Sequence, residues 1–215
     1  IPSVLVISTY DITFHYDAGY YHLNHQNWLR ETNLVFGMVN IFWPFGISSI
    51  YEYISAILWV DNSFILLHFL NLIFIHFFYL FLSENLISSK YIELRNSSIF
   101  LLLFSLLDNF GVMGGRNGFF FIQGVGKQDV AVGILFCFLS LIFFVLIKYE
   151  KLEKSSLFYI SLFSLFIFQI KLSGVVIFYI YLLYLIKLSI LKKEKIKDII
   201  IPQLPVFIIS IFWIM

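Results

Sequence analysis

The sequence predicts an all-α fold, a polytopic transmembrane helix bundle that carries a long loop outside the membrane. The chain of 215 residues is 60% hydrophobic and only 13% charged, with a mean hydropathy of +0.92. A water-soluble domain carries roughly 25% charged residues, so the excess apolar surface requires lipid around it. Uncharged apolar runs recur from residue 64 onward, and Lys and Arg gather in alternate loops between them.

Residues 1–63 predict an extracytoplasmic loop with two amphipathic helices, at about 18–32 and 46–60. Polar residues recur at helical spacing on one side of the second helix: Ser48, Glu52 and Ser55. A short helix that is polar on one side and apolar on the other is typical of the membrane interface rather than of a span. Turn-forming residues separate the two helices: Gly37, Pro44 and Gly46.

Residues 64–215 predict about six spans, the last of them truncated. A helix needs ~20 apolar residues to cross the ~30 Å hydrocarbon core, and the runs at 64–82 and 130–147 come close to this length. The other runs are shorter or interrupted by a charge: 97–113, 157–170, 172–186 and a run that opens near 199. No linker divides the chain, so residues 1–215 are expected to form a single transmembrane domain, continued by further spans on both sides.

The distribution of Lys and Arg predicts the orientation. If the chain before residue 64 is outside, ten of the 14 basic residues fall in the inner loops at 83–96, 148–156 and 187–200. Four are left outside: Arg30, Arg116, Lys127 and Lys171. An excess of positive charge marks the cytoplasmic side. The sequence therefore predicts an integral membrane protein whose chemically capable residues lie on the extracytoplasmic side.

The formal net charge of +1 provides no basic face for nucleic acid. Cys137 is the only cysteine, which excludes an intramolecular disulfide and a cysteine-based metal site. Membrane lipids are the expected surroundings, with the lysine-rich inner loops in contact with anionic headgroups.

The first outer loop combines an acid with imidazoles and phenols in the segment 16–22, Tyr-Asp-Ala-Gly-Tyr-Tyr-His. Asp17 beside Tyr20 and His22 can accept a proton from a sugar hydroxyl, position a phosphate or contribute to a metal site. The alternative is that Asp17 only caps the following helix.

The next outer loop, residues 109–128, contains six of the eleven glycines together with Arg116 and Lys127, and Asp129 follows where the next span begins. Glycine-rich backbone exposes N–H groups to an anion, and basic side chains add charge. The alternatives are a flexible loop whose basic residues face lipid phosphates and an Asp129 that is only a helix cap.

Lys171 lies between two apolar runs, with Leu172, Ser173 and Gly174 left to form a turn. The preceding run of residues 157–170 covers only ~21 Å as a helix, which falls short of a full crossing. Lys171 is therefore expected below the outer surface, facing protein or water, where an ionisable group is a functional candidate. The alternative is that it extends to the outer headgroups.

Three segments resemble bacterial GT-C-type membrane glycosyltransferases, and are most similar to a branch with a Tyr-Asp-x-Gly-x-Tyr-His signature in the first loop. The first is residues 16–22 together with 45–49, Phe-Gly-Ile-Ser-Ser. The second is Lys127-Gln128-Asp129, which is similar to the start of a later span in that branch. The third is Ile170-Lys171-Leu172-Ser173, which is similar to a recurring Lys-x-Ser element.

The resemblance implies a protein of the bacterial inner membrane that transfers a sugar from a polyprenyl-phosphate donor to a glycan, lipid or protein acceptor outside the cytoplasm. It implies that Asp17 is the base, Asp129 a second acidic site residue and Lys171 a phosphate contact. The remaining residues predicted to bind substrate are Tyr20, His22, Arg116, Lys127 and Ser173. Arg116 lies outside the similar segments and is included because it is positively charged and is expected on the extracytoplasmic side. Many members carry an Asp-Glu pair where this chain has Asp17-Ala18, and no cofactor or metal is predicted. Two other functions fit the same residues: a non-catalytic carrier or transporter of lipid-linked saccharide, and a structural membrane subunit.

Overall fold

A computed structural model of the chain describes residues 3, 14, 16–32, 37–46, 49–61, 63–110, 128–149, 154–191 and 195–214, without the side chains of 106–110, 154, 191, 196 and 212–214. The chain divides into two compact units, residues 1–134 and 135–215, which are described separately below. All regular structure in the described residues is helical, apart from one isolated bridge between Val60 and Ser63. The all-α prediction is therefore confirmed.

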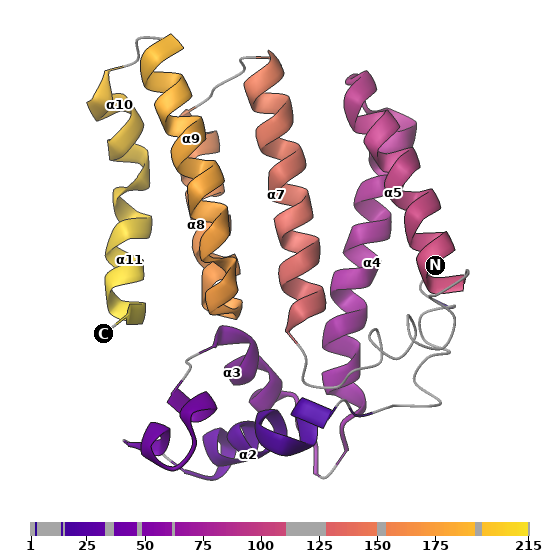
Figure 1. Ribbon diagram of the computed structural model, residues 1–215, viewed down its shortest axis with the longest axis vertical. Coiled ribbons are helices and arrows are strands. Elements are labelled where there is room, and N and C mark those ends of the chain that lie inside the picture. The colour runs from indigo at the N-terminus through magenta and orange to yellow at the C-terminus, as the bar shows by residue number, and fades with distance from the viewer. Residues whose placement is uncertain are drawn as a thin grey trace. The chain divides into compact units, whose positions relative to one another are not determined.

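Unit 1 begins with short helices and ends with two long ones. In chain order these are η2 (Ala18–His22), α2 (Leu23–Glu31), η3 (Met38–Asn40), η4 (Trp43–Gly46), α3 (Ile50–Ile57), α4 (Ile65–Ser88) and α5 (Ile92–Phe110). The short helices gather at the N-terminal end of α4, and α5 packs along α4 (Figure 1). Tyr51 connects the two parts, because its hydroxyl donates to Oδ1 of Asn71 on α4 over 2.6 Å.

The first element, η2, is a π-helix of one turn. The N–H of Leu23 donates to the carbonyl of Ala18, five residues earlier, and α2 continues from there. Such turns are rare and occur frequently at functional sites. The loop after α2 contains Gly37 in the left-handed region at φ +84°, which glycine adopts without strain.

The two helices predicted in the first 63 residues are present. α3 has eight residues and a length of about 12 Å, which is too short to cross the membrane core. Its polar row faces the interior of unit 1, since Glu52 is 3% and Ser55 1% exposed whereas Ile57 is 80% exposed. The amphipathic pattern of α3 therefore reflects contact with protein rather than with water. Its position in the membrane interface stays a prediction.

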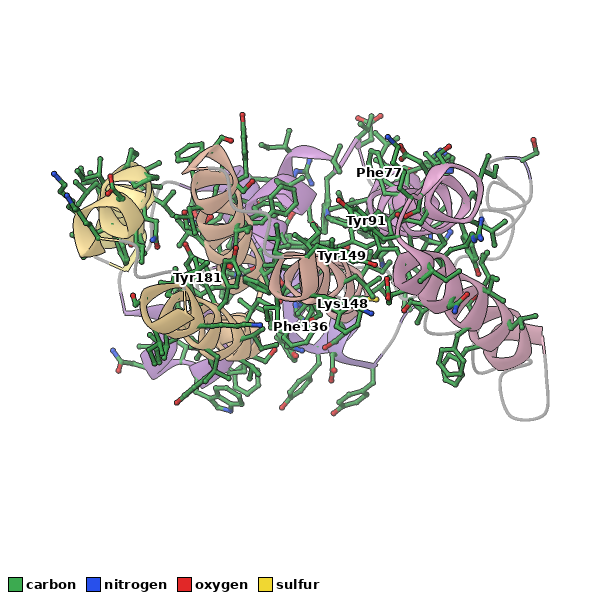
Figure 2. All side chains as sticks on the ribbon, turned by 90° about the horizontal axis from the view of Figure 1, so that it is seen from above. Phe77, Tyr91, Phe136, Lys148, Tyr149 and Tyr181 are labelled. Carbon is green, nitrogen blue, oxygen red and sulfur yellow. The ribbon has the colours of Figure 1, made fainter. Side chains whose placement is uncertain are left out.

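The helix α7 (Asp129–Tyr149) begins in unit 1 and continues in unit 2. Unit 2 then contains α8 (Lys154–Ile170), η5 (Leu172–Val175), α9 (Val176–Leu191), α10 (Ile196–Ile200), η6 (Ile201–Gln203) and α11 (Leu204–Ile214). α8 packs against α9 and α11. At the C-terminal end of α7, Nζ of Lys148 lies 5.9 Å from the ring centre of Tyr149 (Figure 2).

Three helices in the described part of the chain are long and apolar enough to cross a membrane: Ile65–Ser88, Asp129–Tyr149 and Leu172–Ile190. They confirm that this is a membrane protein and match the expected runs at 64–82, 130–147 and 172–186. A shorter apolar helix, Ser155–Ile170, corresponds to the expected short run before Lys171. The remaining spans, the orientation and the single domain stay predictions.

Candidate functional site

A buried carboxylate, Glu52, lies at the centre of a polar cluster in unit 1. Its side chain is 4% exposed. Nε2 of Gln128 lies 2.8 Å from Oε1 and Nε2 of Gln26 lies 3.0 Å from Oε2. Nδ1 of His22 also bonds to Oε1, and Nδ1 of His25 lies 4.0 Å from Oε2. We call these five residues, His22, His25, Gln26, Glu52 and Gln128, the Glu52 network.

The network joins segments that are distant in the sequence: η2 and α2, α3, and the residue that precedes α7. Glu52 is the only acid on α3, and the residues on either side of it in the helix are aromatic or aliphatic. A buried carboxylate is costly unless hydrogen-bond donors surround it. The amide groups of Gln26 and Gln128, which are 0% and 7% exposed, provide two of these donors.

Trp59 fixes the orientation of one of these amides. Its Nε1 donates to Oε1 of Gln26 over 3.1 Å. Because an indole N–H can only donate, the amide oxygen of Gln26 faces Trp59 and its NH₂ group faces Glu52. The guanidinium of Arg30 lies 4.9 Å from the Trp59 ring centre, a cation–π contact that stabilises an exposed site by ~0.5–1 kcal/mol.

Tyr21 is a phenol on which the charges of both predicted acids act. Its pKa is raised above the ordinary value by partial burial and, in decreasing order, by the charges of Asp17, Glu52 and Asp129. The three carboxylates are therefore close enough to Tyr21 for their charges to act on its phenol. Asp17 and Asp129, distant in the sequence, thus both act on a phenol whose ring centre lies 4.2 Å from that of His22 in the Glu52 network.

The capping contact considered for Asp17 is not made at η2. Asp17 occupies the N-cap position of η2, but its backbone is helical and its side chain makes no capping hydrogen bond. Asp129 is the exposed first residue of α7, one position after the cap. A negative charge at this position stabilises the N-terminus of α7. The same charge helps to raise the pKa of Tyr21.

The structure places the other predicted residues as follows. Tyr20 is exposed, stacks on Tyr16 at 5.4 Å between ring centres and contacts Phe42 edge-on at 5.1 Å. Lys171 is half-buried before η5, and Ser173 is exposed within η5, so the predicted turn is confirmed. Both belong to unit 2 and are not placed relative to the Glu52 network. Arg116 and Lys127 lie outside the described residues, as does most of the loop 109–128.

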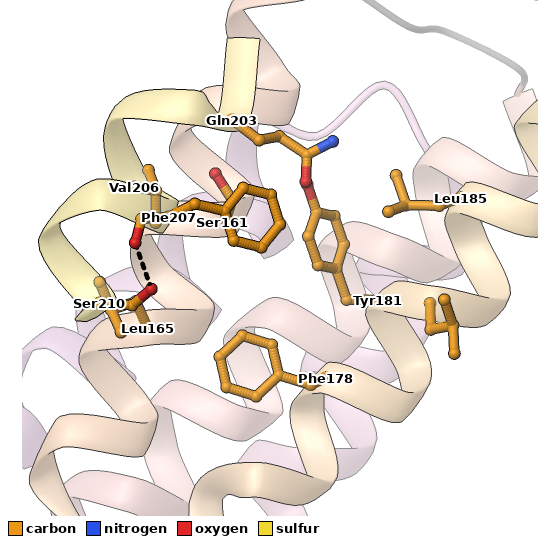
Figure 3. A pocket seen from close by; sticks show the side chains of 10 residues that line it. Ser161, Leu165, Phe178, Tyr181, Leu185, Gln203, Val206, Phe207 and Ser210 are labelled. Carbon is orange, nitrogen blue, oxygen red and sulfur yellow. Dashed lines mark hydrogen bonds between the residues drawn. The ribbon is translucent and has the colours of Figure 1, made fainter. Parts of the chain in front are cut away.

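A cavity of about 290 Å³ lies within unit 2, between α8, α9 and the segment of η6 and α11 (Figure 3). Its polar side chains bond to backbone carbonyls: Ser161 to Phe158 at 2.8 Å, Ser210 to Phe207 at 2.7 Å and Gln203 to Ile199 at 2.6 Å. The remaining lining is mostly aliphatic and aromatic. None of the predicted site residues that the structure describes lines this cavity.

Glu52, Gln26, Gln128 and Trp59 are site residues that the sequence prediction missed. The pattern assigned Glu52 to an amphipathic row, although a lone acid on a short apolar helix was a signal that it would need buried partners. Among the described residues, no group of three or more His, Cys, Asp or Glu side chains is arranged to hold a metal ion.

Burial lowers the pKa of His25; the nearby His22 lowers it further, while Glu52 acts in the opposite direction. Between this lowered pKa and the unfolded value of about 6.5, the unfolded chain binds more protons than the folded one. The contribution of His25 to stability is therefore present above about pH 6.5 and is lost as the pH falls below it. Thermal unfolding in detergent at pH 7.5 and 5.5 should show a smaller loss of stability on acidification for His25→Gln than for the wild type. An equal loss in both proteins would contradict the prediction.

Fold and site together define an α-helical membrane protein with a buried His–carboxylate–amide cluster at the N-terminal end of its first long helix. The chain belongs to the family described as "Domain of unknown function (DUF8201)", whose sequence model matches residues 2–215. No curated protein and no solved structure matches the chain.

Proposed function

We propose that the protein is a membrane glycosyltransferase that moves a sugar from a polyprenyl-phosphate donor to an extracytoplasmic acceptor. The observation that supports this most is the Glu52 network itself, whose His22 contacts Tyr21, a phenol on which the charges of Asp17 and Asp129 also act. Such a group of acceptor side chains suits the binding and deprotonation of a hydroxyl. Its position at one end of a membrane-spanning helix suits a donor held in lipid.

In the proposed reaction, Asp17 takes the proton from the acceptor hydroxyl. The hydroxyl oxygen bonds to the anomeric carbon of the donor sugar, and the bond from that carbon to the phosphate oxygen breaks. The electron pair leaves with the polyprenyl phosphate. Asp129 is the second acid of the site, and Lys171, Arg116 and Lys127 are the cations proposed to contact the phosphate. Tyr20 and Ser173 are proposed to bind substrate.

Asp17→Asn tests the proposal, because it keeps the shape of the side chain and removes the base. Purified protein in liposomes, supplied with radiolabelled polyprenyl-phosphate sugars, should transfer sugar to a lipid or glycan acceptor. Loss of a general base should slow transfer by about 10²–10⁴-fold while donor binding is retained.

Asp61→Asn is the matched control, since Asp61 is an exposed acid of the same unit, in a turn at φ 51° that asparagine also accepts. It should transfer at the wild-type rate. Full activity of Asp17→Asn would show that Asp17 is not the base. Absence of transfer by the wild type with every donor would defeat the proposed function itself.

A further inference from the structure

We propose that Glu52 is a positioning residue that fixes the tautomer of His22, so that Nε2 of His22 accepts a hydrogen bond from a substrate hydroxyl. The identification of that hydroxyl as one on a sugar or acceptor rests on the proposed function. The role of Glu52 in setting the tautomer rests only on the geometry of the network.

The first step follows from what each atom can donate or accept. A carboxylate has only acceptor oxygens, so the atom of His22 that bonds to Oε1 of Glu52, its Nδ1, must carry a hydrogen. In a neutral imidazole the other nitrogen then has a lone pair and no hydrogen. Glu52 therefore makes Nε2 of His22 an acceptor.

The second step is that this acceptor is available. Among the described residues, His22 bonds through Nδ1 to Glu52, and its ring lies tilted against that of Tyr21 with 4.2 Å between the ring centres. Among the described residues Nε2 has no hydrogen-bond partner, and the side chain is 11% exposed. A substrate hydroxyl can donate its hydrogen to this lone pair.

A purely structural role for Glu52, in which it only joins α2, α3 and the start of α7, makes a different prediction for Glu52→Gln. Glutamine keeps the shape of the side chain and can form as many hydrogen bonds in the network. A structural connection would therefore survive the substitution, and nothing in that role depends on which nitrogen of His22 carries the hydrogen.

The fixed orientation of Gln26 determines how glutamine at position 52 would lie. The NH₂ group of Gln26 faces this position, because its oxygen accepts from Trp59. The new amide must therefore place its oxygen toward Gln26 and its NH₂ group toward His22 and Gln128. Gln128 can turn its amide to accept one of these hydrogens, and Nδ1 of His22 must accept the other. The hydrogen of the imidazole then moves to Nε2, which becomes a donor.

Nitrogen NMR of the purified chain in detergent, labelled with ¹⁵N-histidine, measures the tautomer directly. The chain has five histidines, and the signals missing in His22→Gln identify those of His22. At pH 8.5 the wild type should show a protonated Nδ1 and an unprotonated Nε2. Glu52→Gln should show the reverse, with a melting temperature that confirms the fold.

A wild-type His22 that is protonated on Nε2, on both nitrogens or on each in turn would overturn the proposal, whether or not Glu52→Gln folds. A tautomer unchanged by Glu52→Gln would also overturn it.

In the transfer assay, Glu52→Gln should lower kcat/KM for the acceptor about 10–100-fold, as expected for one lost hydrogen bond to a substrate, without weakening donor binding. If the wild type transfers sugar and Glu52→Gln matches it, this inference fails and the proposed function stands. If the two proteins show the expected tautomers but the wild type transfers sugar from none of the donors, the inference stands and the proposed function fails.

Discussion

Glu52→Ala is expected to destabilise the protein by about 3 kcal/mol or more, because it leaves several buried donors without an acceptor. The substitution leaves Nδ1 of His22 and the NH₂ groups of Gln26 and Gln128 without their acceptor. Each buried donor without a partner costs about 1–3 kcal/mol. Equilibrium unfolding in mixed micelles of increasing denaturing detergent would measure the loss.

Glu84→Ala is the control for this experiment, because Glu84 is an exposed acid on α4. Its removal should change stability by no more than about 0.5 kcal/mol. Equal stability of the two variants would show that the Glu52 network contributes nothing to the fold.

The second large effect is expected for Gly174→Ala, at about 1–3 kcal/mol of destabilisation. Gly174 lies in η5, where the chain turns back against the last turn of α8. A Cβ atom on this residue would lie 2.7 Å from the carbonyl oxygen of Ile167 and 2.9 Å from its carbonyl carbon. Because these are backbone atoms, the overlap is relieved only by moving η5 away from α8.

Gly133→Ala provides the opposite expectation from the same chemical change. Gly133 is within α7, and a Cβ atom there would meet nothing within 4 Å. Alanine in a helix interior is favoured over glycine by about 0.5–1 kcal/mol, so this variant should be slightly more stable than the wild type. If both variants were more stable than the wild type, or both less stable, the predicted overlap at Gly174 would be contradicted.

Hydropathy predicted the long helices well because lipid imposes one requirement on all of them. It did not predict where they end. The run expected at 64–82 continues as α4 to Ser88, through polar residues that form a helix but need no lipid. Likewise α5 begins at Ile92, before the expected run at 97–113, and includes Glu93 and Arg95. Apolar runs therefore locate the spanning part of a helix and not its polar ends.

The candidate site was predictable only in part. Residue types and spacing singled out Asp17, His22 and Asp129; His22 contacts Tyr21, and the charges of Asp17 and Asp129 act on its phenol. Periodicity also grouped Glu52 with Ser55 on one face of a helix. It could not show that this face meets Gln26 and Gln128, because that contact depends on the packing of three segments.

The π turn at Ala18–His22 accommodates one extra residue between Asp17 and His22 without separating them. In an α-helix, residues five apart point about 140° away from each other around the axis. The bond from Leu23 to Ala18 closes the turn over five residues instead, so Asp17 and His22 return toward the same side. Deleting one residue between them would restore a regular helix in which the two residues are four apart, and residues four apart also lie on one face. Searches for further proteins with this site should therefore accept two intervals from aspartate to histidine: four residues in a regular helix and five across a π turn.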